Sequence, residues 1–411
     1  MKRLKVLLSA YACRPGMGSE PGVGWNVSRE LAKYHQVWVL TRGNNRPTIE
    51  AEIHQNPIPN LQIIYCDFPD WAMAWKKGNR GVYLHYYLWQ ILAYFTAKKI
   101  HAQENFDLVH HVTYVRYSSP SFLSLLPIPF IWGPVGGGES TPQSFREEFS
   151  LKNHIYEFLR SLTHKAGEFD PFTRLTAHRS VLAWGTTNDT AKRLTAIGAK
   201  RVEVLSQLGL SSEELAQLSQ YKNSDPQQKL RFISVGRLLH WKGFHLGLRA
   251  FALANFPNEI EYWIVGDGSE RERLQALAKA LKIDHQVKFC NELPRPETFK
   301  TIGQSLALIH PSLHESGGMV CLEAMAAGCP VICLDLGGPA LQVTPETGFK
   351  IPAQDPEQTV NELAEIMIRL SGDPQLRNTL GESAQKRALE EFSWDKKGKC
   401  LALNYEEIYN Y

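Results

Sequence analysis

Short apolar segments alternate with longer amphipathic segments along most of the chain. The longer segments, such as GWNVSRELAKY, space their apolar residues as a helix does, whereas the short ones have the length and residue types of buried strands. The strand-like segments fall into two series, LKVLLSA, QVWVLT, LQIIYC, DLVHHV, PFIWG and SVLAWGT, then LRFISVG, IEYWIVG, HQVKFC, SLALIHP and CPVICL. This alternation predicts an α/β fold with doubly wound parallel sheets.

A polar segment, LGLSSEELAQLSQYKNSDPQQKL, separates the two series and contains the step Asp225–Pro226. Such a segment is typical of a break between domains. We therefore predict two Rossmann-like domains, an N-terminal one over residues 1–208 and a C-terminal one over residues 209–392. Two facing domains would enclose a cleft, and ligands of open α/β sheets bind at the carboxyl ends of the strands.

The composition is that of a soluble globular protein, with 43% hydrophobic and 21% charged residues in a chain of 411. The net charge of +3 conceals an asymmetry, since residues 1–205 carry 24 Lys and Arg against 16 Asp and Glu. A basic N-terminal half favours anionic partners such as phosphates or a lipid surface, although it also serves solubility. Seven scattered cysteines without a CxxC pair support neither a zinc site nor a disulfide framework, which fits a cytoplasmic protein.

Two segments raise the question of a membrane. The basic and apolar start, MKRLKVLLSAYAC, resembles a signal peptide, but its apolar part is short and leads into a glycine-rich turn, so we predict a buried strand. No uncharged segment reaches the roughly 18–20 apolar residues of a membrane-spanning helix. The aromatic segment Gly81–Ala97 is flanked by basic residues. It leaves two alternatives, a helix packed on its own sheet or membrane contact through Trp71–Lys99.

Glycines follow the first predicted strand in SAYACRPGMGSEPGVGWN. Gly16 and Gly18 leave a backbone that a bulky ligand can approach, and the next helix would point its amides at the cleft. The dinucleotide pattern GxGxxG fails at Pro21, and the phosphate-binding pattern GxxxxGK[ST] does not occur in the sequence. Taken alone, the segment fits a ligand site and an ordinary strand–helix turn equally well.

Two cations follow the first strand of the second series, in FISVGRLLHWKGF. Arg237 and Lys242 stand between that strand and the next helix, where a planar guanidinium and an ammonium can grip a diphosphate. The alternative is a pair of solvated surface charges.

Two glutamates flank a glycine pair in HPSLHESGGMVCLEAM. The helix that starts after the pair offers unpaired amides and a positive dipole end to phosphate oxygens. Glu323, a short way into this helix, can accept hydrogen bonds from two ribose hydroxyls, and Glu315 can reach the hydroxyls of a sugar beyond the diphosphate. The alternative is that Glu315 caps the helix and Glu323 forms a salt bridge.

These motifs resemble those of retaining GT-B glycosyltransferases of the family 4 type. HESGGMVCLEAMAAGCPVI resembles the E-x7-E region of that family, SVGRLLHWKGFHLGLRAFA its diphosphate-binding loop, and YWIVGDGSERERL its VGDG strand and loop. The resemblance covers most of residues 230–340 and is looser over the N-terminal domain. It implies a GT-B fold of two facing Rossmann-like domains, in which a final helix over residues 393–411 returns to the first domain.

The resemblance also implies a role for each matching residue. Arg237 and Lys242 would neutralise the nucleotide diphosphate, Glu315, counted as catalytic, would hold the donor sugar, and Glu323 would hold the ribose. The remaining predicted donor residues lie in the glycine turn, in the loop near the nucleobase and in the N-terminal domain: Gly16, Gly18, Asp267, Gly268, Ser316, Gly317, Gly318, Met319 and Val320.

The family places a catalytic histidine after a strand of the N-terminal domain, and FDLVHHVTYVRYSSP offers His110 and His111. They are adjacent, whereas the family separates its histidines by one residue. Adjacent strand side chains point to opposite faces, so only one of the two can face the cleft. We predict His111, with His110 as the alternative. In FIWGPVGGGES, we predict Gly137, Gly138 and Glu139 on the acceptor side.

The predicted activity is transfer of a sugar, with retention, from a nucleotide-diphosphate donor to a hydroxyl of a sugar, lipid or lipid-linked acceptor. No DxD-like acidic pair stands in a suitable loop, so we expect cations and a helix dipole to act in place of a metal ion. We expect no nucleic acid partner, and a cytoplasmic protein that is either free or peripheral on the inner face of the membrane. Glycolipid or cell-surface polysaccharide synthesis would use such an enzyme. These residues specify neither the donor base and sugar nor the oligomeric state.

Two other functions fit part of the same pattern. A nucleotide-sugar epimerase of related architecture would need acid and base carboxylates in the cleft and would turn over the donor alone. An inactive sugar-nucleotide-binding or membrane-docking protein would keep binding through Arg237 and Glu323. The intact set of two cations and two glutamates favours the transferase.

Overall fold

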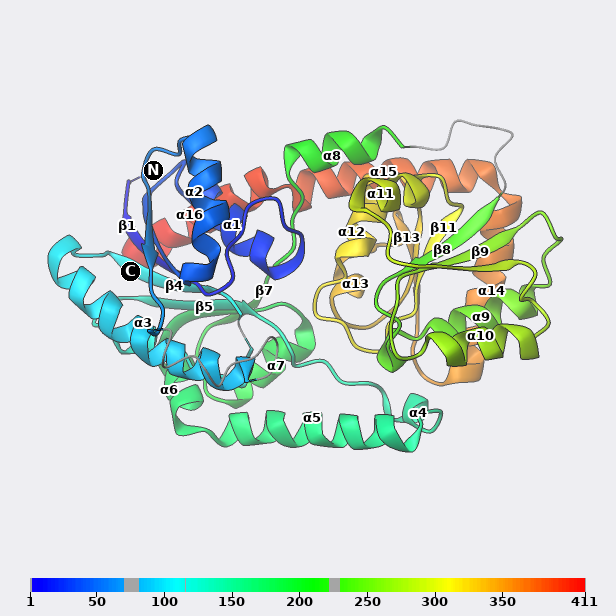
Figure 1. The fold of residues 1–411 in the computed structure, drawn as a ribbon, viewed down its shortest axis with the longest axis horizontal. Helices are drawn as coiled ribbons and strands as arrows, with labels where there is room; N and C mark the ends of the chain where they lie inside the picture. The colour runs from blue at the N-terminus through cyan, green and yellow to red at the C-terminus, as the bar shows by residue number, and fades with distance from the viewer. Residues whose placement is uncertain (1, 70–80, 115, 222–229, 411) are drawn as a thin grey trace. The chain divides into compact units, whose positions relative to one another are not determined.

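The computed structural model describes residues 2–69, 81–114, 116–221 and 230–410. It divides into two compact units (Figure 1). The N-terminal unit comprises residues 1–138, 159–208 and 394–411, and the C-terminal unit comprises residues 139–158 and 209–393. The sequence-based division leaves residues 139–158 in the N-terminal domain, whereas their contacts place them in the C-terminal unit.

The N-terminal unit is built on a sheet of seven parallel strands in the order β3-β2-β1-β4-β5-β6-β7. The strands are β1 (Lys5–Ala10), β2 (Gln36–Thr41), β3 (Leu61–Tyr65), β4 (Leu108–Thr113), β5 (Phe130–Val135), β6 (Ser180–Gly185) and β7 (Val202–Val204). The chain reverses its direction of progress across the sheet between β1 and β4. Ligands of doubly wound sheets bind at such switch points.

Helices cover both faces of this sheet. They are α1 (Ser19–Leu31), α2 (Arg46–Gln55), α3 (Val82–Glu104), α6 (Pro171–Arg179), α7 (Asn188–Ala196) and α16 (Trp394–Asn410), with the short 3₁₀ helices η1 (Gly43–Asn45) and η3 (Phe122–Leu125). Successive residues of β1 pack into different hydrophobic cores on the two faces of the sheet. Val6 and Leu8 pack in the core under α1 and α16, and Leu7 packs in the core under α3.

The C-terminal unit has a second parallel sheet, of six strands in the order β10-β9-β8-β11-β12-β13. The strands are β8 (Arg231–Val235), β9 (Glu261–Val265), β10 (Val287–Cys290), β11 (Ala307–His310), β12 (Val331–Leu334) and β13 (Gly348–Ile351). Its helices are α4 (Gln143–Arg146), α8 (Ser212–Ser219), η4 (His240–Lys242), α9 (Phe244–Ala254), α10 (Arg271–Ala280), α11 (Arg295–Gly303), α12 (Met319–Ala326), α13 (Gly337–Gln342), α14 (Pro356–Gly372) and α15 (Pro374–Phe392). Helix α5 (Leu151–Phe169) contains the boundary between the units.

The predicted fold class, two α/β units with parallel sheets, is confirmed. Each predicted strand lies where the apolar segments indicate, and the short strands β7 and β13 are additional. Within the described residues, no helix is both long enough and apolar enough to cross a membrane. Part of the segment Trp71–Lys99, residues 71–80, lies outside the described residues, and the rest forms most of α3.

Close packing of α16 on α1 completes the N-terminal unit and depends on Gly398. A Cβ atom at this position would lie 2.4 Å from the Cβ of Glu30 on α1. The two helices can therefore approach only because residue 398 has no side chain.

We predict that Gly398→Ala destabilises the N-terminal unit by about 1–3 kcal/mol, because the new methyl group must push the helices apart. The matched control is Lys399→Ala, at the exposed neighbouring position on α16. Thermal unfolding followed by circular dichroism measures both variants. An unchanged melting temperature in Gly398→Ala would show that α16 is not packed on α1 in this way.

Candidate functional site

Two loops of the C-terminal unit carry most of the predicted donor residues. Strands β8 and β11 are adjacent and parallel, so the loops that follow them lie at the same edge of the sheet. The first loop runs through η4 to α9, and the second runs from His310 to the start of α12. Ligands of parallel sheets bind at this edge.

Lys242 in the first loop and Glu315 in the second form an ion pair. Both side chains are largely buried, with exposed fractions of 16% and 20%, and Nε2 of His310 lies 3.7 Å from Oε2 of Glu315. Burial raises the pKa of the Glu315 carboxyl, but His310 and Lys242 outweigh it and hold that pKa well below its usual value. Burial lowers the pKa of His310. Glu315 is therefore an ionised hydrogen-bond acceptor beside an ammonium group.

Gly243 lets the first loop reach the second. It has a left-handed backbone with φ of 66°, and a Cβ atom there would lie 1.9 Å from the carbonyl oxygen of Pro311. The amide of Leu313 donates to the carbonyl of Trp241 at 2.8 Å. This close approach, which only glycine permits, sets Lys242 beside Glu315.

The glycine pair, Gly317 and Gly318, sets the backbone conformation at the start of α12. Gly318 has a left-handed backbone with φ of 83°, and the side-chain amide of Gln342 donates to the carbonyl of Gly317 at 2.7 Å. Met319 and Val320 then begin the helix, and both are half-buried. The first amides of a helix have no partner within it, so this turn can receive an anion.

Glu323 is paired with a residue that the sequence analysis does not single out. Its Oε1 accepts from Nη2 of Arg295 at 3.1 Å, and the same guanidinium group lies 2.7 Å from Glu214. Burial raises the pKa of Glu323 to about 7, and Arg295 opposes this rise. The salt bridge set out above as the alternative for Glu323 is thus present, and the ribose-binding role stays a prediction.

Glu139 is buried in the C-terminal unit, where it accepts a hydrogen bond of 2.5 Å from the hydroxyl of Ser316. A residue predicted for the acceptor side thus contacts one predicted for the donor. Arg237 is exposed, and no hydrogen bond or ion pair of its side chain is recorded among the described residues. Asp267 is exposed and accepts from the amide of Gly268 at 2.8 Å.

The two candidate histidines point to opposite faces of β4, as expected for neighbours in a strand. His110 bonds the hydroxyl of Tyr405 and the carbonyl of Gly133 through its two ring nitrogens. Nε2 of His111 lies 3.2 Å from the hydroxyl of Tyr86, and its buried Nδ1 has no recorded hydrogen-bond partner within the described residues. Burial lowers the pKa of His110 to about 4 and that of His111 to about 3. Both rings are therefore neutral near pH 7.

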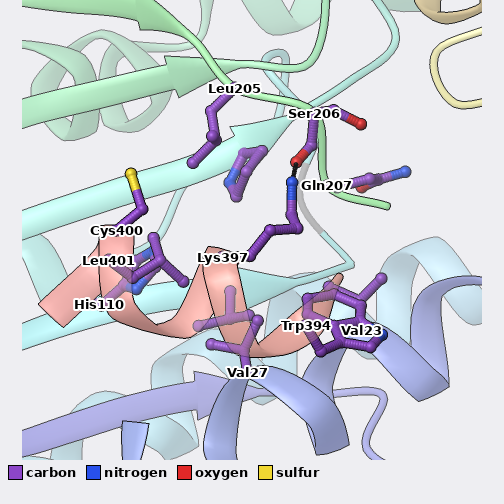
Figure 2. A pocket seen from close by; sticks show the side chains of 12 residues that line it. Val23, Val27, His110, Leu205, Ser206, Gln207, Trp394, Lys397, Cys400 and Leu401 are labelled. Carbon is purple, nitrogen blue, oxygen red and sulfur yellow. Dashed lines mark hydrogen bonds between the residues drawn. The ribbon is translucent and has the colours of Figure 1, made fainter. Parts of the chain in front are cut away.

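His110 also borders a small pocket inside the N-terminal unit (Figure 2). Lys397 reaches across it to donate to the carbonyl of Ser206 at 2.5 Å, and burial lowers the pKa of Lys397 to about 8. The lining is mainly apolar and comprises Val23, Val27, His110, Val112, Pro134, Leu205, Ser206, Gln207, Trp394, Lys397, Cys400 and Leu401. Such a lining does not suit a diphosphate.

The glycines predicted in the N-terminal unit lie in the loops that follow β1 and β5. Gly16 has a left-handed backbone with φ of 67° and open space where a side chain would stand, and Gly18 is the N-cap residue of α1. Gly137 has φ of 92°, and the amide of Gly138 donates to the hydroxyl of Thr190 at 3.1 Å. Their roles toward donor and acceptor stay predictions.

Glu157 on α5, which the sequence analysis does not predict as a site residue, contacts both of the loops that follow β8 and β11. Its Oε1 lies 3.1 Å from Nε2 of His240 and 3.3 Å from Nε2 of His314. The rings of Tyr156, Trp241 and His314 stack, with centroid distances of 5.3 Å at both steps. Helix α5 carries several other polar residues, so nothing in the local sequence distinguishes Glu157 as the residue that makes this contact.

Among the described residues, no group of three or more His, Cys, Asp or Glu is arranged to hold a metal ion. The arrangement at the edge of the C-terminal sheet instead offers cations, a helix start and an ionised carboxylate. These groups suit a ligand that is both anionic and rich in hydroxyls.

The C-terminal unit matches a known protein family. Residues 217–387 match the family described as Glycosyl transferases group 1. The D-inositol 3-phosphate glycosyltransferase of Corynebacterium jeikeium is 33% identical over 183 residues, which are 42% of this chain and 42% of that protein. The lipopolysaccharide core biosynthesis glycosyltransferase LpsE of Rhizobium meliloti is 28% identical over 205 residues, 49% of this chain and 57% of that protein. These matches span about half the length of the curated relatives or less.

Solved structures resemble the whole chain. Sucrose-phosphate synthase from Thermosynechococcus elongatus has a TM-score of 0.67 at 18% identity and covers 99% of this chain and 100% of its own. HepE of Anabaena, solved in complex with UDP and glucose, has a TM-score of 0.59 at 17% identity and covers 98% of this chain and 100% of its own. At these identities the likeness concerns the fold, which is the GT-B fold of glycosyltransferases.

We predict that Glu323→Gln changes how stability depends on pH. The pKa of Glu323 in the folded state, about 7, lies above the unfolded value of 4.5, so the folded wild type loses stability as pH rises through this interval. The neutral amide has no such loss. Between pH 5 and pH 8 the wild type should therefore lose roughly 2–3 kcal/mol relative to the variant.

Urea unfolding of both proteins at the two pH values measures this difference. The control is Glu365→Gln, at an exposed glutamate on α14, which should keep the pH dependence of the wild type. Parallel pH dependences for the wild type and Glu323→Gln would contradict the burial of an uncharged Glu323 at low pH.

Proposed function

Because residues 217–387 match the family described as Glycosyl transferases group 1, within a chain of GT-B fold, we propose that the protein is a retaining glycosyltransferase. It moves a sugar from a nucleotide-diphosphate donor to a hydroxyl acceptor. The ion pair between Lys242 and Glu315, beside the start of α12, is the observation that carries this proposal.

The proposed donor site uses both charges of this pair. Lys242 and the exposed Arg237 balance the diphosphate, and the first amides of α12 receive its oxygens. The ionised carboxylate of Glu315 accepts hydrogen bonds from the donor sugar. Glu323 turns from Arg295 to the two ribose hydroxyls, while Glu214 keeps the guanidinium group paired.

In the proposed reaction, the bond between the anomeric carbon and the diphosphate oxygen breaks, and the leaving group gains negative charge. Lys242, Arg237 and the helix start stabilise this charge as it develops. The acceptor hydroxyl attacks from the face that the leaving group occupies, and a diphosphate oxygen takes its proton. No protein nucleophile takes part, and the residues present require no metal ion for these steps.

We retain His111 as the proposed catalytic histidine, with His110 as the alternative. Both ring nitrogens of His110 are used within the fold, by Tyr405 and Gly133. His111 has one ring nitrogen, the buried Nδ1, for which no hydrogen bond is recorded within the described chain, so its ring is less committed to the fold than that of His110. The proposed acceptor residues remain Gly137, Gly138 and Glu139.

The proposed acceptor is a lipid-linked or cell-surface saccharide, met at the inner face of the membrane. One relative is named for lipopolysaccharide core biosynthesis. Helix α3 also supports membrane contact, because four apolar side chains at helical spacing are exposed along it: Leu84, Leu88, Ile91 and Phe95. The exposed Lys98 and Lys99 follow them.

Thermal shifts with UDP, GDP and ADP sugars, each with and without Mg²⁺, test the donor site. A donor at about 100 times its dissociation constant should add roughly 2.7 kcal/mol of stability. We expect a shift with one nucleotide series that does not depend on Mg²⁺. The absence of a shift with every donor would overturn the proposal, and isomerisation of the donor sugar without an acceptor would identify an epimerase.

We predict that Arg237→Ala weakens donor binding about ten-fold or more, because a charge-assisted bond to phosphate is lost. Arg237 is exposed, so its replacement should leave the fold unchanged. The matched control is Lys279→Ala, which removes an exposed cation from α10. Equal donor affinity in both variants, measured by titration calorimetry, would remove Arg237 from the site.

A further inference from the structure

Helix α5 carries its apolar residues on the outside. Its only buried residues in the described structure are polar, Asn153 and Glu157. Six apolar side chains are exposed by half or more: Leu151 at 77%, Ile155 at 52%, Phe158 at 68%, Leu159 at 53%, Leu162 at 54% and Phe169 at 74%. A surface helix of a soluble protein shows the opposite pattern.

The exposed residues form one continuous stripe. Leu151, Ile155, Phe158 and Leu162 follow one another at intervals of four, three and four residues, which places them on one face of the helix. Three turns of this face are thus apolar and open to solvent. Contiguous apolar surface of this kind marks an interaction site.

Polar contacts on the other side fix the orientation of the stripe. Glu157 is bonded to His240 and His314, and the ring of Tyr156 stacks on Trp241. Rotating the helix to bury its apolar face would break these contacts and expose the histidines without their partner. The stripe therefore faces outward for a structural reason.

The charges beside the stripe are positive. Lys152 and Lys165 are exposed on α5, and Arg160 is half-buried. The two acidic residues of the helix are occupied inside the fold, since Glu157 bonds the histidines and Glu168 bonds Tyr117 and Arg193. An apolar stripe with basic flanks has the chemistry of a helix that lies in the interface of an anionic bilayer.

We propose that α5 docks the protein on an anionic membrane surface, with its apolar stripe among the acyl chains and its lysines at the headgroups. A second copy of the chain is a poorer occupant, because pairing two such stripes would bring their like-charged flanks together. Helix α6, which follows α5 in the chain, also exposes two apolar side chains, Phe172 and Leu175. This inference deepens the proposed function by naming where the enzyme meets a lipid-linked acceptor.

Co-flotation with vesicles tests the proposal on the full chain. Vesicles of phosphatidylcholine alone are compared with vesicles that also contain phosphatidylglycerol. We expect binding to the anionic vesicles, and at least a ten-fold weaker partition for the double variant Phe158→Ser/Leu162→Gln. These side chains point to solvent, so the variant should keep the melting temperature and the nucleotide-induced shift of the wild type.

The matched control is Leu253→Ser/Leu389→Gln, which removes two equally exposed leucines from α9 and α15 and should bind vesicles as the wild type does. Lys152→Glu/Lys165→Glu should lose the preference for anionic vesicles. Unchanged flotation of the α5 variant, or loss of flotation only in the α3 variant Leu84→Gln/Phe95→Gln, would overturn the proposal. So would a wild-type dimer that the α5 variant converts to a monomer.

Vesicle binding can be measured whether or not the protein has transferase activity. Vesicle binding without any nucleotide-induced shift would support α5 docking and contradict the proposed function. A nucleotide-induced shift of the melting temperature without vesicle binding would support the proposed function and contradict docking through α5.

Discussion

Glu315 can be a buried carboxylate only because Lys242 and His310 lie beside it. Removing a carboxylate from water costs several kcal/mol, and a neighbouring ammonium group offsets most of that cost. The pair in turn requires Gly243, since any side chain there would collide with Pro311 and move Lys242 away. The conformations of the two loops after β8 and β11 are therefore set together, by one electrostatic requirement and one steric requirement.

This balance also explains how the site can respond to a ligand. His310 and the positive charge of Lys242 keep Glu315 ionised. An arriving diphosphate would share that ammonium group, while the hydroxyls of a sugar would take over part of the solvation of the carboxylate. Glu323 follows the same logic, because Arg295 is shared between it and Glu214 and can release one partner without being left unpaired. Lys242, Glu315 and Glu323 thus each have a partner in the structure, whereas none is recorded for Arg237 among the described residues.

The fold could be predicted well because the signals for strands and for glycine turns each lie within a short segment of the sequence. Each long strand is a predominantly apolar segment, and the glycines at positions 243 and 318 stand where the backbone needs a left-handed conformation. The strands β7 (VEV) and β13 (GFKI), which the apolar segments did not indicate, are short, and each is interrupted by a charged residue. The sequence-based division left residues 139–158 in the N-terminal domain, whereas they belong to the C-terminal unit. Nothing in their composition indicates which of the two sheets they contact.

The site was predictable only where its residues come from one segment. Glu315, the glycine turn that follows it and Glu323 come from one short segment and stand out together in the sequence. The partners Arg295 and Glu157 come from distant segments, and their roles depend on contacts across 28 and 83 positions of the chain. For Glu157 the sequence was misleading as well. An apolar stripe with polar residues opposite normally predicts a buried apolar face, and here the tertiary contacts of the polar side reverse that expectation.

Because its polar side faces inward, α5 contacts the two loops that follow β8 and β11. The side of the helix that faces inward bonds His240, two residues before Lys242, and His314, next to Glu315. Any force that shifts the helix must therefore act on both loops through Glu157 and through the stack of Tyr156 on Trp241. Partitioning of the apolar side into a bilayer would supply such a force, and the histidine contacts would resist it with the energy of two buried hydrogen bonds, about 1–3 kcal/mol each. The polar contacts of α5 would therefore couple the proposed docking of its apolar side to the two loops that follow β8 and β11.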